Sequence, residues 1–183
     1  MIHKAPLTSA AQILLVAVAL TTVAAGCSTE VRGTATALPD LDLSKFTNEP
    51  CALLTPAQVA GLGTLKTPEP RQAPLGPQCR WDPQKVTKPA YSVTLATKGQ
   101  TMESLREKFK DATKYRETVV SGYPAFSYDA GDGKGMCNTV VDSSHKDAIV
   151  VNVIGEFTKA AENTDYCDVA EMVAASVVAN VKP

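Results

Sequence analysis

The alternation of hydrophobic and polar positions changes period along the chain, and each period predicts a type of element. Tyr91, Val93 and Leu95 alternate with small or polar residues, as in a half-buried strand. A further strand is expected to open at Cys79-Arg80-Trp81. Four more short apolar segments predict strands near residues 118–120, 125–128, 136–141 and 148–154.

Two longer segments have the apolar spacing of amphipathic helices. In residues 101–115 the residues on the apolar face are Met102, Leu105, Phe109 and Ala112. In residues 164–180 they are Cys167, Ala170, Val173 and Val177. Each helix has a single apolar face, so each is expected to cover a sheet.

A third, shorter helix is predicted to begin after Thr55. Thr55 suits the N-cap, Pro56 the first helical position, and Gln58 completes a capping box. Gly61 is expected to end this helix. The proline-rich stretch 64–77 then predicts an exposed loop.

These elements together predict the fold class. Several strands joined by tight turns indicate an antiparallel sheet, and the single-sided helices indicate layers that cover it. We therefore expect one α+β domain, a sheet flanked by helices and stapled by disulfides.

The N-terminus has the layout of an export signal. Lys4 precedes an apolar run at 13–25, and small residues lead into Cys27, so residues 1–26 are predicted to be a secretory signal peptide. The ending Val23-Ala24-Ala25-Gly26-Cys27 resembles a lipobox, in which the cysteine receives a diacylglyceryl group. The alternative is a plain secreted protein with an odd cysteine near its cleavage site. We expect residues 27–50 to be a flexible tether and 51–183 the globular domain.

The other four cysteines, Cys51, Cys79, Cys137 and Cys167, are predicted to form disulfides, because such a cysteine content suits an oxidising compartment. Three pairings are possible. The sequential one, Cys51–Cys79 with Cys137–Cys167, is favoured because each pair closes a comparable local stretch. A zinc site is not expected, since the chain has no C-x-x-C motif and a single histidine after the signal peptide.

Composition and charge narrow the class of partner. The 183 residues are 44% hydrophobic, enough for a proper core, but only 5% aromatic, and the net charge is −1. A nucleic-acid-binding domain would carry a basic surface and stacking aromatics. We therefore expect no nucleic-acid partner.

One polar turn contains the residue types of a hydrolase. His145 lies beside Asp142, Ser143, Ser144 and Asp147. A Ser–His–Asp triad needs three converging side chains, and the chain has no G-x-S-x-G motif. We expect a solvated turn and no catalytic residue here.

No cofactor or metal motif emerges. The segment Gly131-Asp132-Gly133-Lys134-Gly135 matches neither the spacing of a phosphate-binding loop nor that of a calcium loop. It predicts a hairpin loop. Four aromatic residues could line a ligand groove, although core packing is their expected role: Trp81, Tyr123, Phe126 and Tyr128.

Several motifs resemble a known family. They are Cys51-Ala-Leu-Leu-Thr-Pro-Ala-Gln-Val, Cys79-Arg80-Trp81, Gly122-Tyr123-Pro124-Ala125, Cys137 and Cys167-Asp-Val-Ala, with Val31-Arg32-Gly33-Thr34-Ala35 after the lipidation site. Over about residues 49–182 the chain resembles the actinobacterial lipoproteins grouped as domain of unknown function family 3558. The resemblance implies an actinobacterial cell envelope and a fold similar to the Mog1/PsbP group. It implies no activity and no functional residues.

The function expected from the sequence is therefore general. A membrane-anchored, non-enzymatic module on the outer face of the cell membrane would bind an envelope protein, a cell-wall polymer or an envelope lipid. One alternative is a lipid or glycolipid carrier, which needs an apolar cavity. Another is a cell-wall hydrolase, which needs two converging carboxylates.

Overall fold

The computed structural model describes residues 38–155 and 164–183. The predicted signal peptide, Cys27 and the start of the predicted tether lie outside these ranges. Within them, seven strands form one sheet in the order β1-β2-β3-β7-β6-β5-β4, and every neighbouring pair is antiparallel. The strands are β1 Glu69–Ala73, β2 Gly76–Trp81, β3 Ala90–Ala96, β4 Thr113–Val120, β5 Tyr123–Asp129, β6 Met136–Asp142 and β7 Ala148–Ile154.

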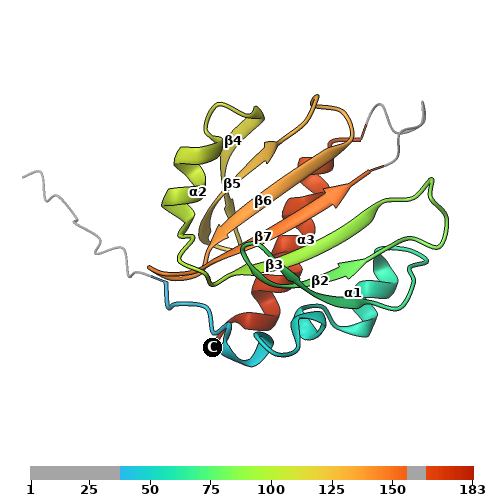
Figure 1. Ribbon diagram of the computed structural model, residues 1–183, viewed down its shortest axis with the longest axis horizontal. Helices are drawn as coiled ribbons and strands as arrows, with labels where there is room; N and C mark the ends of the chain where they lie inside the picture. The colour runs from blue at the N-terminus through green and yellow to red at the C-terminus, as the bar shows by residue number, and fades with distance from the viewer. Residues whose placement is uncertain (1–37, 156–163) are drawn as a thin grey trace, which may run out of the picture. The chain divides into compact units, whose positions relative to one another are not determined.

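Helices cover both faces of this sheet. They are η1 Ser44–Phe46, η2 Pro50–Leu53, α1 Pro56–Gly61, α2 Met102–Phe109 and α3 Tyr166–Val181. Figure 1 shows α3 passing behind the sheet, and its Val173 and Val177 share one buried cluster with Val93 of β3 and Val151 of β7. This confirms the antiparallel sheet flanked by helices.

The opposite face carries a second, smaller cluster. Met102 and Leu105 of α2 pack with Phe126 and Val140 of β5 and β6. Successive residues of a strand point to opposite faces, so the two clusters are separated by the sheet itself. The predicted apolar face of α3 is therefore fully buried, whereas on that of α2 Met102 and Leu105 are buried and Phe109 is only partly buried.

The segment before Cys51 belongs to the folded domain. Leu41 and Leu43 are buried in the same cluster as α3. The amide of Leu41 donates to the carbonyl of Ser143 (2.9 Å), and the amide of Asp42 donates to the carbonyl of Val181 (3.1 Å). Of the predicted tether 27–50, the described part from residue 38 onward therefore packs on the domain, since Leu41 and Leu43 are buried in its core. The predicted boundary at residue 51 is too late.

The proline-rich stretch 64–77 is not simply a loop. It contains β1 and the start of β2, and Trp81 ends a strand that we expected it to open. Strand β1 lies at the edge of the sheet, where a proline need not donate to a neighbouring strand. Pro70 occupies such a position opposite Cys79.

The helix predicted over 101–115 is also shorter than expected. It ends at Phe109, and β4 begins at Thr113. The backbone of Lys114 has a φ of 54°, and the register of β4 with β5 shifts between Thr113 and Arg116. At this irregular start of β4, apolar and polar residues do not alternate as they would in a regular strand. The helical spacing of apolar residues therefore continues from α2 into β4, and the sequence shows no boundary between the two elements.

Both predicted disulfides are present. Cys51 is bonded to Cys79 and Cys137 to Cys167. No helix in the described ranges is long and apolar enough to cross a membrane.

Candidate binding site

Helix α1 is fixed in place by local sequence signals. The Thr55 hydroxyl accepts a hydrogen bond from the amide of Gln58 (3.3 Å), and the Gln58 carboxamide accepts one from the amide of Thr55 (2.7 Å). The predicted capping box is thus confirmed. Asn180 at the end of α3 donates to the Gln58 carboxamide (2.7 Å) and to the carbonyl of Leu53 (2.9 Å). The side chain that caps α1 therefore also ties it to α3.

A pocket of about 820 Å³ lies beside α1. Its wall comes from η2, α1, the segment after α1 and β2; we call it the α1 pocket. The lining residues are Cys51, Ala52, Leu54, Pro56, Val59, Ala60, Gly63, Thr64, Leu65, Pro68 and Trp81. None of them is charged, and most are apolar. Small-molecule pockets typically have volumes of about 300–1,000 Å³ and mainly apolar walls, so this one suits an apolar ligand.

Trp81 is one of the residues that line the α1 pocket. Its side chain is fully buried, yet no atom of the described residues accepts a hydrogen bond from its indole Nε1–H. A buried donor without an acceptor costs about 1–3 kcal/mol. Because the side chain has no exposed surface, this donor is not accessible from the α1 pocket.

A smaller pocket of about 340 Å³ adjoins the α1 pocket. Both share three lining residues, Gly63, Thr64 and Leu65. Lys85 and Lys88, from the β2–β3 connection, line the smaller one, which we call the lysine pocket. Neither lysine is predictable as a pocket residue from the sequence, because nothing in their spacing distinguishes them from other surface lysines.

The turn that carries His145 borders two polar hollows of about 380 and 400 Å³. Burial raises the pKa of the Asp142 carboxyl; the charges of His145 and Arg106 oppose this effect and that of Asp40 adds to it. A hydrolase site would need its residues at such a hollow. The residues of this turn that meet that requirement are Asp142, Ser143, Ser144 and His145.

The serines of this turn do not form a triad with His145. The Ser144 hydroxyl accepts from the amides of Lys146 (3.3 Å) and Asp147 (3.2 Å). The Ser143 hydroxyl is buried and has no partner among the described residues. No hydrogen bond in the described ranges joins a serine to the imidazole.

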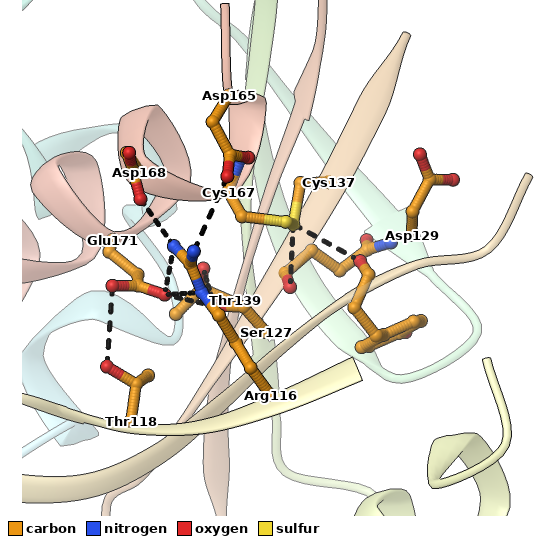
Figure 2. Close-up of a disulfide and its surroundings, with 12 residues drawn as sticks. Arg116, Thr118, Ser127, Asp129, Cys137, Thr139, Asp165, Cys167, Asp168 and Glu171 are labelled. Carbon is orange, nitrogen blue, oxygen red and sulfur yellow. Dashed lines mark hydrogen bonds and ion pairs between the residues drawn. A yellow bond between two sulfur atoms is a disulfide. The ribbon is translucent and has the colours of Figure 1, made fainter. Parts of the chain in front are cut away.

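A charged cluster lies where β4 meets α3. Figure 2 shows Arg116 pointing at three carboxylates of the α3 segment. Its guanidinium lies 3.4 Å from Asp165, 2.5 Å from Asp168 and 2.9 Å from Glu171. We call this the Arg116 cluster; its ion pairs connect β4 to the first turns of α3.

Glu171 is the central acceptor of that cluster. It accepts hydrogen bonds from the hydroxyls of Ser127 (2.8 Å) and Thr118 (3.4 Å), and Ser127 also bonds to Thr139 (2.9 Å). In Figure 2 these groups lie beside the disulfide that joins Cys167 to β6. The disulfide and the hydrogen bonds hold the first turns of α3 on the sheet.

The four aromatic residues considered for a groove do not form one. Trp81 and Tyr123 belong to the core cluster on the α3 face, whereas Phe126 and Tyr128 belong to the cluster on the α2 face. Burial raises the pKa of Tyr128 to about 12. Core packing therefore accounts for them, and only Trp81 also lines the α1 pocket.

Among the residues that the structure describes, no group of three or more histidine, cysteine, aspartate or glutamate side chains could hold a metal ion. The glycine-rich segment 131–135 connects β5 to β6, as predicted for a hairpin loop. Cys27, the predicted lipidation site, lies outside the described residues.

Comparison with known proteins gives one match. The model of a family described as "Protein of unknown function (DUF3558)" matches residues 22–180. No curated protein matches the chain, and no solved structure does.

Proposed function

The chain belongs to the DUF3558 family, and from that premise we propose that its domain is a non-enzymatic binding module that holds an apolar ligand in the α1 pocket. The observation that carries the proposal is a large pocket whose lining residues are uncharged and mostly apolar.

The energetics favour a ligand with an alkyl chain. Each methylene that leaves water for an apolar wall contributes about 0.8 kcal/mol. Ala52, Pro56, Ala60 and Thr64, which line the pocket, are exposed, so the pocket opens on the surface. This supports a module that holds a partly exposed ligand more than a carrier that encloses one.

The cellular setting is part of the proposal. We propose that Cys27 carries the lipid anchor and that the domain works at the outer face of an actinobacterial cell membrane. The lipobox-like ending at Cys27 supports the anchor, and the disulfides Cys51–Cys79 and Cys137–Cys167 support an oxidising compartment. A sheet flanked by helices on both faces is compatible with a Mog1/PsbP-like fold.

The chain's only tryptophan makes a direct test possible. Trp81 fluorescence is recorded while the full-length protein is titrated with monomeric 1-palmitoyl lysophosphatidylcholine. We expect a saturable change in emission, because an acyl chain in the α1 pocket would change the surroundings of Trp81, which is one of its lining residues.

Two alanines of α1 provide a matched pair of variants. Ala60 lines the pocket and Ala57 does not, although both are exposed. Ala60→Glu places a charge in the pocket and should abolish the titration, whereas Ala57→Glu should leave it unchanged. No saturable signal with the unmodified protein, or equal binding by both variants, would refute the proposal.

A further inference from the structure

We infer that the β4–β5 hairpin and the segment at Leu38 form a surface that docks on the phospholipid layer to which the chain is anchored. The inference goes beyond the α1 pocket and rests only on the proposed lipid anchor at Cys27. Three exposed apolar residues that meet at one end of the sheet carry it.

The tip of the β4–β5 hairpin is a tight turn of two residues. Its central residues, Ser121 and Gly122, have φ values of 53° and 95°, and positive values at both positions are what a type I′ turn requires. The turn leaves Val119 directly opposite Pro124 in the register of β4 with β5. Opposite residues of an antiparallel pair lie on the same face of the sheet, so these two side chains are neighbours.

Leu38 extends this apolar surface from a distant part of the chain. Its Cδ1 atom would lie 3.3 Å from a Cβ added at Gly122. Leu38, Gly122 and Pro124 also line the same hollow. The Tyr123 hydroxyl donates to the carbonyl of Pro39 (2.9 Å), and this bond holds the segment beside the hairpin.

We call Leu38, Val119 and Pro124 the hairpin patch. Val119 is 65% exposed, Leu38 is 47% exposed, and Pro124 is exposed as well. Exposed apolar side chains that gather in one place are typical of surfaces that contact a membrane or another protein. The position of the patch along the chain favours the membrane.

The chain reaches the hairpin patch soon after the proposed anchor. Leu38 lies eleven positions after Cys27. An extended chain advances at most about 3.6 Å per residue, so the lipid group and Leu38 are separated by at most about 40 Å. Such an anchor gives the patch a high effective concentration at the lipid surface, and even a weak apolar contact is then populated. A free protein partner has no such advantage.

Charges of both signs surround the hairpin patch. Lys182 donates to the carbonyl of Ser121 (3.2 Å), whereas Asp40 and Asp142 line the adjoining hollow together with His145. Because neither sign dominates, we attribute the contact to the apolar side chains, whose transfer into the headgroup boundary is favourable. The contact should therefore form on uncharged phosphatidylcholine and should withstand added salt.

The β2–β3 connection provides a control position at the other end of the sheet. In the strand register, Ala125 of β5 is level with Ile149 near the start of β7. Ala90, which follows the β2–β3 connection, is opposite Ile154 at the end of β7. Val86 of this connection is 96% exposed, more than any residue of the patch named above. It should nevertheless stay in water when the patch docks.

The test measures how close each position comes to the lipid. The full-length protein, purified in its lipidated form with its disulfides intact, is reconstituted into phosphatidylcholine vesicles. Val119→Cys or Val86→Cys supplies a single free thiol for a fluorescent label, because the four other cysteines of the domain are bonded in pairs. A phosphatidylcholine that carries a nitroxide near its headgroup should quench the label at position 119 and leave the label at position 86 unquenched.

A matched pair of variants identifies what holds the label at the lipid. Leu38→Glu, added to the protein labelled at position 119, places a charge in the hairpin patch and should abolish the quenching. Val86→Glu adds the same charge at the opposite end of the sheet and should leave the quenching unchanged. Added salt should not reduce it either.

The outcomes separate the docking surface from the anchor. Equal quenching at positions 119 and 86, or quenching at position 119 that survives Leu38→Glu, would overturn the inference. Flotation of the same vesicles tests the anchor by itself. Protein that floats without quenching at position 119 refutes the docking surface alone, whereas protein that does not float refutes the proposed anchor and the docking surface with it.

Discussion

Cys51 in η2 and Cys79 in β2 are joined by a disulfide that fixes one wall of the α1 pocket to the sheet. Its loop spans 28 residues and that of Cys137–Cys167 spans 30. The two bonds should therefore contribute nearly equally to stability, while only the first lies at the pocket.

We predict that the two disulfides differ in their effect on binding. Replacing either pair by serine should lower the free energy of unfolding by about 3–4 kcal/mol, as expected for loops of this length. Only Cys51→Ser/Cys79→Ser should also weaken lysolipid binding, because its pocket wall is no longer held. Urea denaturation and Trp81 titration measure the two effects; equal affinity in both folded variants would contradict the prediction.

A second prediction concerns the contact between Gly155 and Tyr166. A Cβ added at Gly155 would overlap the phenol ring at the start of α3. Gly155→Ala should therefore lower the free energy of unfolding by about 1–3 kcal/mol or more through overpacking. Gly61→Ala is the control, since a Cβ added there would have no neighbour within 4 Å and alanine favours the helix. A stable Gly155→Ala protein in chemical denaturation would show that Tyr166 can move aside.

The Arg116 cluster yields a third prediction. Glu171→Ala should lower the free energy of unfolding by about 1–3 kcal/mol, because it leaves the buried Ser127 with one partner fewer and removes an acceptor from Arg116. Asp168→Ala removes a carboxylate whose side chain is 71% exposed and should cost about 0–1 kcal/mol. Thermal and urea denaturation of the two variants would test this order, and equal losses would contradict it.

The fourth prediction concerns pH and Asp142. The pKa of its carboxyl is raised above the ordinary value of 3.8, chiefly by burial, so its charged form disfavours the folded state. With the carboxyl protonated this penalty is absent, so the free energy of unfolding is highest below pH 3.8. It falls as the pH rises through the raised pKa. Asp142→Asn cannot ionise and should raise the Tm near neutral pH, a gain that vanishes in acid.

Asp42 offers a control of opposite sign. Hydrogen bonds from Ser44 lower the pKa of its carboxyl, so its stabilising effect is present above the ordinary pKa of 3.8 and is lost as pH falls. Asp42→Asn should therefore lower the Tm slightly near neutral pH. If both variants shifted the Tm in the same direction, the surroundings of each carboxyl would not determine whether its charge stabilises the fold.

Local signals in the sequence predicted much of this fold. The capping box at Thr55 and Gln58 and the apolar face of α3 depend on residues within a few positions of one another, so the sequence displays them directly. The disulfides also followed from local spacing. Strand β1 could not be predicted from local sequence. A strand tolerates a proline such as Pro70 when it lies at the edge of the sheet, and that position is a property of the whole sheet.

The candidate site was far less predictable. The sequence suggests Trp81 as a potential ligand contact, but its presumed aromatic neighbours Phe126 and Tyr128 lie on the other face of the sheet. The α1 pocket forms only when η2, α1 and β2 meet. Its residues are small or apolar, and no pattern along the chain marks such residues as a binding site.

The hydrogen bond from the amide of Asp42 to the carbonyl of Val181 has a consequence for the order of assembly. These two residues lie far apart in the sequence, yet Leu41 and Leu43 share their core with α3. Until α3 has been synthesised, that core is incomplete, and Cys137 lacks its disulfide partner. A chain cut short before α3 therefore cannot bury Leu41 and Leu43 against it, and this domain can assemble only after residue 181 has been made.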